Sequence, residues 1–493
     1  MSDGVPVEAE VTKKHIVPCR WAAVPRSQSR GGEASYPAEP HLAAFTLRPS
    51  AIDTFSATKA HARSLEHLHT FTTRKHLRRA PSITMAHTTD AAAIPPPATT
   101  PVTNGALPAE DAAGETVAAI AEADKISADE IALYDRQIRL WGVQAQEKIR
   151  TANILLVSIK ALANEIAKNL VLAGIGSITL ADHENVTEDD LGASFFISDA
   201  DVGKNRAEAA KPQVEKLNPR VTVKTITTDI RNVQDPGFYA AYDVIIVTDM
   251  DFLSTSALNA GARIAKKPFY AGASHGMYGY IFADLVEHNF VIEREKSNRD
   301  TQIGPETTTR SVKDVQVKKE NGKVVELVSK QELYSPLMLV KDSPLPVEIA
   351  NNARRLKKVH PLLTCVRALW EYQRNGHGVY PSHTPQELQL FTTIANVKHQ
   401  ELLLPADSLK AEVLRSFLQN LGSELAPVTA FLGGQLAQDV INVLGQREQP
   451  IQNLMLFDGE DSAGPVYTLH PIFPGAPVPI MPSVPVNARV TIV

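Results

Sequence analysis

Residues 153–182 read NILLVSIKALANEIAKNLVLAGIGSITLAD, and this stretch decides the fold class. It opens with a short continuous apolar run, which is typical of a strand buried on both faces. A helical stripe of apolar residues follows over about 164–173 and stops at two glycines. A second apolar run, residues 177–181, ends at Asp182. The stretch therefore predicts a strand, a tight turn, a helix and a second strand.

A terminal acid about twenty residues after the turn completes the first half of a Rossmann-type unit. The alternation continues downstream, with strands predicted at 221–227, 243–247 and 269–271 and a helix at about 254–266. Strands and helices at this spacing predict a mainly parallel sheet covered on both faces. Residues 276–283 read as a strand in a later antiparallel part. We therefore expect an α/β, Rossmann-like fold.

Helices are expected on both sides of this unit. Ser127-Ala-Asp-Glu130 has the form of a capping box, which predicts a helix start, and a second helix is expected at 144–150. Periodicity predicts two more helices at 360–373 and about 411–421. Residues 294–330 are charged and irregular, so a solvated loop or a short hairpin is the default interpretation.

These patterns divide the chain into five segments. We expect a disordered N-terminal extension, a Rossmann-like domain, a reduced insert of loop and helices, the return of the first domain, and an extended tail. Their predicted bounds are 1–125, 126–295, 296–425, 426–472 and 473–493.

Composition excludes several classes of protein. The 493-residue chain has a formal net charge of −5 and a pI of about 6.3, which argues against a nucleic-acid footprint. No run approaches the roughly 18 apolar residues of a membrane helix, so no membrane partner is expected. Two cysteines are too few for a disulfide framework, which fits the cytosol or nucleus. The basic run at 353–358 could be a nuclear-localisation patch, although a solvated helix face is the commoner meaning.

The first hundred residues differ from the rest. They contain Arg-Gly-Gly and Pro-Pro-Pro patches and many Ser, Thr and Ala residues without a sustained period, which indicates disorder. Residues 11–88 carry many basic and few acidic residues, a composition that faintly suggests a mitochondrial transit peptide. Alternatively Met85 is the true start, and the residues before it are a gene-model extension or a dispensable tail.

The first strand-to-helix turn lacks the glycines that nucleotide binding requires. Glycines there allow a tight turn, a close approach of phosphate and the packing of helix on strand. Here the turn runs from Ser158 through Lys160 to Ala163. Alanine is tolerable at the last position, but serine and lysine place side chains where phosphate would lie. The pattern favours a Rossmann domain with a degenerate phosphate loop, kept for packing.

Six segments, in order, resemble the ubiquitin-activating enzyme family, including the bacterial MoeB/ThiF adenylyltransferases. The similarity runs from about residue 127 to 472. The segments are YDRQIRLWG at 134–142, NEIAKNLVLAG at 164–174, DHENV at 182–186 with VGKNRA at 202–207, FLGGQLAQDV at 431–440, and LFDG at 456–459. Among the branches of the family, the pattern is most similar to the smaller subunit of the SUMO-activating heterodimer.

Departures from the family pattern indicate the role. The resemblance implies a Gly-x-Gly-Gly-x-Gly turn and an Asn-x-x-Arg-Gln segment in active members. Counting from Asp182 places Asp190, Ala193 and Ser194 at that second segment, and Glu184 at a second ribose-side aspartate. Asp182 and Lys204 are retained, and Asp249 or Asp251 could be the acid for magnesium. With the turn and the arginine both lost, we expect no cofactor on this chain, and ATP and magnesium in a partner subunit.

The resemblance also implies a role for Arg136, in the Tyr-x-Arg-Gln segment. In this family that arginine reaches across the dimer into the partner's ATP site, where a guanidinium offers a fixed fork of donors to phosphate. The alternative is a surface arginine paired with a nearby acid. Arg139, one turn further on, is the weaker candidate.

Neither cysteine looks like the thioester nucleophile of the family. Cys19 lies in the predicted tail, and Cys365 lies among apolar residues at helical spacing, where a small buried hydrophobe is expected. No Cys-x-x-Cys pair is present for the structural zinc of the catalytic subunits.

We therefore expect an obligate regulatory subunit, inactive alone, that acts with the catalytic large subunit on SUMO in the nucleus and cytoplasm. The helices at the end of the sheet, Phe195-Phe196 and the late helix are expected to contact that subunit. The pair Gly433-Gly434 in the late helix is interpreted as a close approach within the dimer. The alternatives are a regulatory subunit for a Nedd-type modifier, a self-sufficient MoeB/ThiF-like adenylyltransferase, and an NAD-dependent dehydrogenase.

Overall fold

The computed structural model describes residues 127–471, except for residues 234, 321 and 377–378. The chain divides into two compact units, Met1–Asn104 and Gly105–Val493, and every described residue belongs to the second. The predictions for the N-terminal extension, for Cys19 and for the extended tail lie outside the described residues. Within the described range, no helix has both the length and the apolar character needed to span a membrane.

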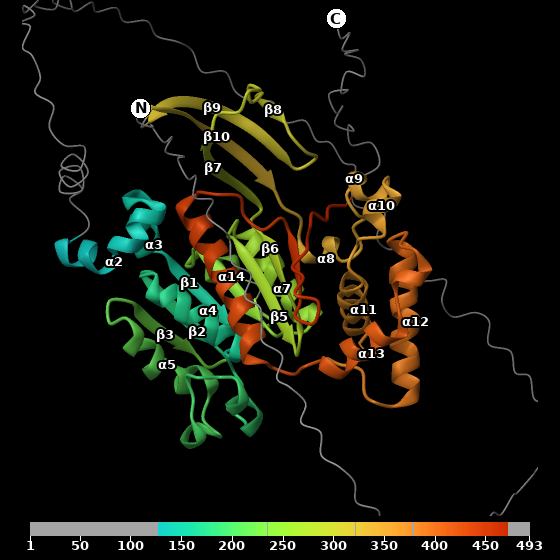
Figure 1. Ribbon diagram of the computed structural model, residues 1–493. Coiled ribbons are helices and arrows are strands. Elements are labelled where there is room, and N and C mark those ends of the chain that lie inside the picture. The colour runs from blue at the N-terminus through green and yellow to red at the C-terminus, as the bar shows by residue number, and fades with distance from the viewer. Residues whose placement is uncertain (1–126, 234, 321, 377–378, 472–493) are drawn as a thin grey trace, which may run out of the picture. The chain divides into compact units, whose positions relative to one another are not determined.

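An eight-stranded mixed sheet forms the centre of the described unit (Figure 1). Its order is β12-β11-β6-β5-β4-β1-β2-β3. The strands from β5 to β3 pair in parallel, and β6, β11 and β12 add an antiparallel edge. The bounds are β1 Asn153–Val157, β2 Ser177–Ala181, β3 Thr222–Ile226, β4 Val244–Thr248, β5 Phe269–His275, β6 Tyr278–Asp284, β11 Leu454–Asp458 and β12 Val466–Tyr467. The predicted α/β class with a mainly parallel sheet is confirmed.

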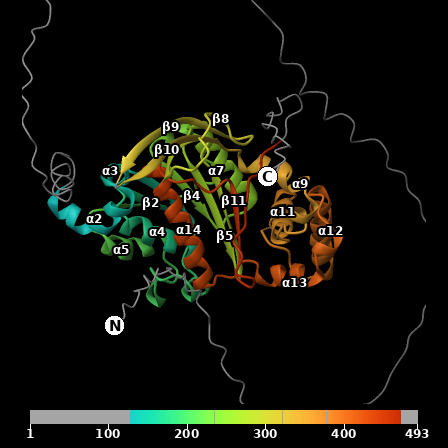
Figure 2. The same cartoon turned by 45° about the horizontal axis from the view of Figure 1, so that its top comes forward.

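Helices cover both faces of this sheet because its strands are apolar on both sides. On one face α4 and α14 lie side by side, as Figures 1 and 2 both show, and Ile154 and Ile246 pack beneath them in one core cluster. On the other face Leu155 and Ile245 belong to a second cluster with α7 and α11. The helix bounds are α2 Ala128–Trp141, α3 Val143–Thr151, α4 Ala161–Leu172, α5 Arg206–Leu217, α6 Pro236–Ala240, α7 Phe252–Ile264 and α14 Ala426–Gly445.

The entry into the fold follows the predicted capping box. Ser127 caps α2, its hydroxyl accepts the N–H of Glu130, and the Glu130 carboxylate accepts the N–H of Ser127. Tyr134 then packs on Gly174, where a Cβ would lie 2.5 Å from the ring. This contact fixes α2 against the end of α4, so the exposed side of α2 has a defined position.

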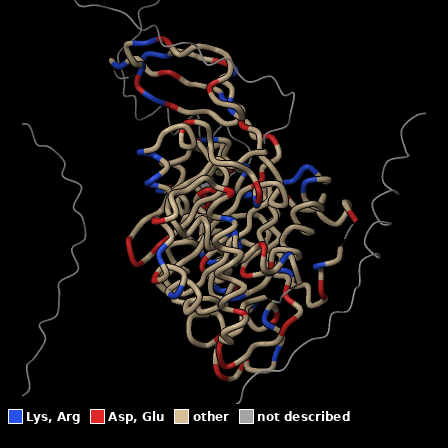
Figure 3. The backbone as a smooth tube through the Cα atoms, turned by 90° about the vertical axis from the view of Figure 1, so that its right-hand side faces the viewer, with Lys and Arg blue, Asp and Glu red and all other residues tan. Residues whose placement is uncertain are grey.

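Residues 287–333 form a second sheet, which corrects the prediction of a loop or short hairpin. Its order is β7-β10-β9-β8, with bounds β7 Glu287–Glu295, β8 Gly304–Pro305, β9 Arg310–Glu320 and β10 Lys323–Leu333. Acidic and basic residues are interspersed along it (Figure 3). Some of these charges are paired and partly buried, for example Lys330 with Glu306 at 2.8 Å and Arg310 with Glu332. Several of the charges that suggested a solvated loop are therefore paired across the strands of a sheet.

The segment between this sheet and α14 is helical. Its elements are α8 Leu337–Val340, α9 Val347–Ala350, α10 Ala353–Leu356, α11 Leu362–Arg374, α12 Pro385–Glu401 and α13 Ala411–Asn420. The helices predicted at 360–373 and 411–421 are confirmed as α11 and α13. The sequence analysis missed α12. Trp370 of α11 is buried against Tyr280 of β6, so these helices pack onto the antiparallel part of the central sheet.

Gly433 also corrects a prediction. A Cβ on Gly433 would lie 2.5 Å from the Cβ of Glu165 and 3.2 Å from the backbone nitrogen of Ile166. The close approach is therefore between α14 and α4 of the same chain, and it explains the first glycine of the pair without a second subunit. A Cβ on Gly434 would meet no described atom within 4 Å.

Candidate functional site

Two cavities lie at the carboxyl ends of the parallel strands, where open α/β sheets bind their ligands. One has a volume of about 180 Å³ and includes Ser158, Asp182 and Asp249 in its lining. The other, of about 490 Å³, is lined in part by Asp190. Lys160 borders both cavities, so the degenerate turn lies between them.

The turn keeps the backbone path of a glycine turn although its residues have changed. Ser158 has φ +68°, a left-handed conformation that favours glycine. The hydroxyl of Thr248 donates to the carbonyl of Ser158 at 2.7 Å and holds it there. Lys160 then forms the N-cap of α4 without a side-chain capping bond, and Ala163 is fully buried in that helix. The turn is thus preserved in shape and changed in chemistry.

Both carboxylate oxygens of Asp182 accept hydrogen bonds from backbone N–H groups of this chain. Its Oδ2 accepts the N–H of Ile159 at 2.7 Å, and its Oδ1 accepts the N–H of Glu184 at 2.9 Å. An acid at the end of this strand would hold a ribose hydroxyl in a dinucleotide-binding domain. Here one carboxylate oxygen binds inside the phosphate turn and the other binds the following loop.

Arg206 pairs with two further acids of this region, Asp190 and Glu184, and the sequence analysis assigned it no role. Its Nε contacts Asp190 at 3.0 Å and its Nη1 pairs with Glu184. Burial alone would raise the pKa of Asp190, but hydrogen bonds from Thr187 and Arg206 outweigh it and lower the pKa. The hydrogen bond from Arg206 likewise lowers the pKa of Glu184. An arginine three positions after a glycine in VGKNRA was the available signal, but nothing in the sequence identified its partners.

Of the other predicted residues, Asp251 lines the smaller cavity and Ala193 lines the larger one. The Lys204 ammonium contacts Asp201 at 2.9 Å, a pairing that helps to lower the pKa of Asp201 to about 2, and Lys204 lines neither cavity. Ser194 is buried near Asp190, to which its N–H donates. Asp251 caps α7 by accepting the N–H groups of Leu253 and Ser254. Asp251 is therefore committed to a structural bond.

Asp249 lies deeper in the site. Its Oδ1 accepts the N–H of Ser274 at 2.8 Å, whereas its Oδ2 is buried without a partner among the described residues. Burial raises the pKa of Asp249 to about 6. Across the turn, burial raises the pKa of Glu424 to about 7, and the charge of Asp249 adds to this shift. The two carboxyl groups resist being ionised together. No sequence motif marks Glu424 as part of this site.

Arg136 is exposed on α2, away from both cavities. No hydrogen bond or ion pair of its side chain is found among residues 127–471. Arg139 differs, because its Nε contacts the Asp135 carboxylate at 3.0 Å. Of the two arginines, Arg136 is therefore the one that is exposed without an ion pair among the described residues.

Cys365 lies inside α11 and is fully buried, as the sequence predicted. Burial raises the pKa of its thiol to about 12, and the thiolate is the form that attacks electrophiles. We expect Cys365 to resist iodoacetamide in the native full-length chain and to be labelled after unfolding in urea, as measured by peptide mass spectrometry. Rapid native labelling at Cys365 would contradict the assignment of a structural thiol.

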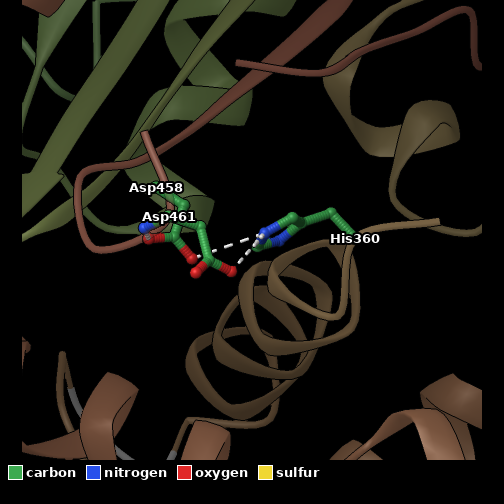
Figure 4. Close-up of side chains that lie close together, drawn as sticks. All are labelled: His360, Asp458 and Asp461. Carbon is green, nitrogen blue, oxygen red and sulfur yellow. Dashed lines mark hydrogen bonds and ion pairs between the residues drawn. The ribbon is translucent and has the colours of Figure 1, made fainter. Parts of the chain in front are cut away.

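His360, Asp458 and Asp461 bring three potential metal ligands together (Figure 4). The Nε2 atom of His360 lies 3.4 Å from Asp458 Oδ2, and the Nδ1 atom accepts the N–H of Leu362 at 3.3 Å. A neutral imidazole that accepts at Nδ1 carries its proton on Nε2, where a metal would have to bind. The arrangement therefore fits a histidine–aspartate contact that ties the start of α11 to the turn after β11.

The sheet topology and the altered nucleotide-binding turn define a Rossmann-like class of protein with a degenerate phosphate loop. The comparison with known families agrees with this class. Residues 134–471 match the ThiF family, and the chain belongs to that family.

Individual relatives span the same region. The chain is 36% identical over 354 residues to SUMO-activating enzyme subunit 1 of Homo sapiens, covering 70% of this chain and 97% of the relative. It is 37% identical over 341 residues to DNA damage tolerance protein RHC31 of Saccharomyces cerevisiae, covering 68% and 96%. A solved structure, Crystal structure of E. coli MccB + Succinimide, aligns over 70% of this chain and 74% of its own with 16% identity and a TM-score of 0.38.

Proposed function

We propose that this chain is the regulatory subunit of a SUMO-activating heterodimer. In this role it joins a catalytic large subunit in the ATP-dependent adenylation of SUMO, thioester formation and transfer to a conjugating enzyme. The observation that carries the proposal is the state of the phosphate turn, where Asp182 binds the N–H of Ile159 and Lys160 replaces a glycine. A chain with this site needs a second subunit that binds ATP and magnesium. We infer that the modifier is SUMO from the names of relatives such as SUMO-activating enzyme subunit 1.

An exposed apolar surface supports a partner subunit. Leu140 of α2 is 78% exposed, and Leu172 at the end of α4 and Phe431 of α14 are also exposed. A cavity of about 220 Å³ beside α2 is lined by residues of α2, α4 and α14, including Gly434. Exposed large apolar side chains beside such a hollow are typical of a protein–protein interface. Phe195 is exposed as well, whereas its neighbour Phe196 is buried in the core.

Arg136 lies on the same α2 helix as Leu140, one turn away. A partner subunit that covers the apolar side of α2 would contact the Arg136 guanidinium at the edge of the interface. In the proposal this guanidinium enters the partner's ATP site and stabilises the charge on the transferring phosphate. The chain then contributes to catalysis without a cofactor of its own. We place the heterodimer in the nucleus and cytoplasm, which agrees with the free thiol of Cys365.

ATP–pyrophosphate exchange in the presence of SUMO tests this function directly. We expect no exchange by the full-length chain alone, because its turn cannot hold the nucleotide, and exchange when the SUMO-type large subunit is added. Mixing with the Nedd-type large subunit and its modifier is the control for partner identity. Exchange only with the Nedd-type pair would move the chain to that branch, and exchange by the chain alone would make it a self-sufficient adenylyltransferase.

A further inference from the structure

The segment 420–425, between α13 and α14, lies in the degenerate nucleotide site. Gly422, Ser423 and Glu424 line the cavity of about 490 Å³ together with Lys160. This cavity borders the N-terminus of α4, the place where a nucleotide-binding domain would hold phosphate. A segment from the far end of the chain therefore faces the position of the missing ligand.

The segment is fastened there by the turn between β5 and β6. The N–H of Gly276 donates to the carbonyl of Ser423 at 2.7 Å, and the N–H of Met277 donates to Asn420 Oδ1 at 3.0 Å. A Cβ on Gly276 would lie 1.9 Å from Asn420 Oδ1, so the two segments are in close contact. A Cβ on Gly422 would lie 2.9 Å from the Tyr380 ring. The segment is therefore held by two separate parts of the chain, the β5–β6 turn and Tyr380.

Glu424 presents its carboxylate to the beginning of α4. Burial raises the pKa of Glu424 to about 7, whereas the charge of Lys160 and the backbone N–H of Ala161, the first residue of that helix, act in the opposite direction and favour its ionised form. Backbone N–H groups and a lysine are the donors that phosphate would use at a helix N-terminus. One oxygen of Glu424 and the Oδ2 of Asp249 are buried without a partner in the described part of the chain. The site thus already contains carboxyl groups of its own.

We propose that the segment 420–425 is a built-in plug, and that the Glu424 carboxylate occupies the phosphate position at the N-terminus of α4. A phosphate entering this site would have to displace the Glu424 carboxyl group, and it would also meet the Asp190 carboxylate, which lines the same cavity. Loss of the glycines alone would leave a weakened phosphate site. The plug converts it into one that rejects anions.

Pyrophosphate binding by the full-length chain without a partner tests the plug. Isothermal calorimetry and the thermal unfolding midpoint are measured for the wild type, Glu424→Ala and the isosteric Glu424→Gln. Glu412→Ala, an exposed glutamate in the first turn of α13, is the matched control. We expect no pyrophosphate binding by the wild type or the control, and affinity at least about tenfold higher in both Glu424 variants, since the freed helix terminus and Lys160 attract the anion.

Three outcomes would overturn the proposal: wild type that binds pyrophosphate as well as the variants, no gain in a folded Glu424→Gln, or an equal gain in Glu412→Ala. If Glu424→Ala fails to fold, Glu424→Gln decides alone, because it keeps the shape of the side chain and removes its charge. The measurement uses neither SUMO nor the large subunit. Its failure is therefore distinguishable from failure of the exchange assay.

Discussion

Replacing Arg136 with alanine is expected to lower SUMO-dependent ATP–pyrophosphate exchange by the heterodimer roughly 100- to 1,000-fold. Removing one preorganised donor from a charged transition state costs on this order, and arginines supplied in trans are at the upper end of the range. The Arg136 side chain is exposed and has no acidic partner among the described residues. Its loss should therefore leave this chain intact and act only through the partner's site.

Arg139→Ala is the matched control for that experiment. Arg139 lies on the same helix, carries the same charge and is already paired with Asp135 on a surface where such pairs contribute little to stability. We expect exchange by Arg139→Ala to remain within about threefold of wild type, the scale of a surface ion pair. Heterodimer formation, measured by gel filtration, should be unchanged in both variants. Full exchange by assembled Arg136→Ala would remove the trans role.

The fold could be predicted because its information is local and repeated. The apolar runs of β1, β2 and β4 are too continuous for amphipathic helices, and the short connection from β1 to β2 leaves room only for one crossover helix. The capping box at Ser127 is likewise contained in four residues, and the structure has both of its hydrogen bonds.

Elements with mixed signals were missed for physical reasons. Helix α12 has few buried residues along its 17, so its sequence shows no strong apolar stripe. In β10, buried acids such as Glu326 and Glu332 alternate with other residues, and their burial depends on arginines from neighbouring strands. A charged segment of this kind reads as a loop until its cross-strand partners are known.

The residue types of the site could be predicted from the sequence, but the contacts between distant segments could not. Ser158 and Lys160 reveal from the sequence alone that the glycine turn is lost, because that turn is formed by consecutive residues. Glu424 enters the same site from more than 250 positions away, through contacts of a segment with no motif of its own. Arg206 shows the same limit, since its acidic partners are set by how two loops fold together.

Gly433 and Gly434 give the second large effect, with opposite signs at adjacent positions. Gly433→Ala is expected to destabilise the isolated full-length chain by about 2–3 kcal/mol, because the new methyl group must push α14 away from α4. Gly434→Ala adds a methyl group that meets no described atom, so the better helix propensity of alanine should stabilise the chain by up to about 1 kcal/mol. Urea unfolding midpoints of the two variants measure the difference.

The same pair separates the chain's own packing from its interface. Gly434 lines the cavity beside α2 on the apolar surface that we assign to the large subunit. Gly434→Ala should therefore weaken binding of the large subunit, measured by calorimetry, even though it stabilises the chain alone. Equal destabilisation by both substitutions would show that α14 as a whole cannot accept a side chain at this level. Unchanged binding by Gly434→Ala would move the partner's contact off this surface, because a closely packed interface does not absorb an added methyl group without cost.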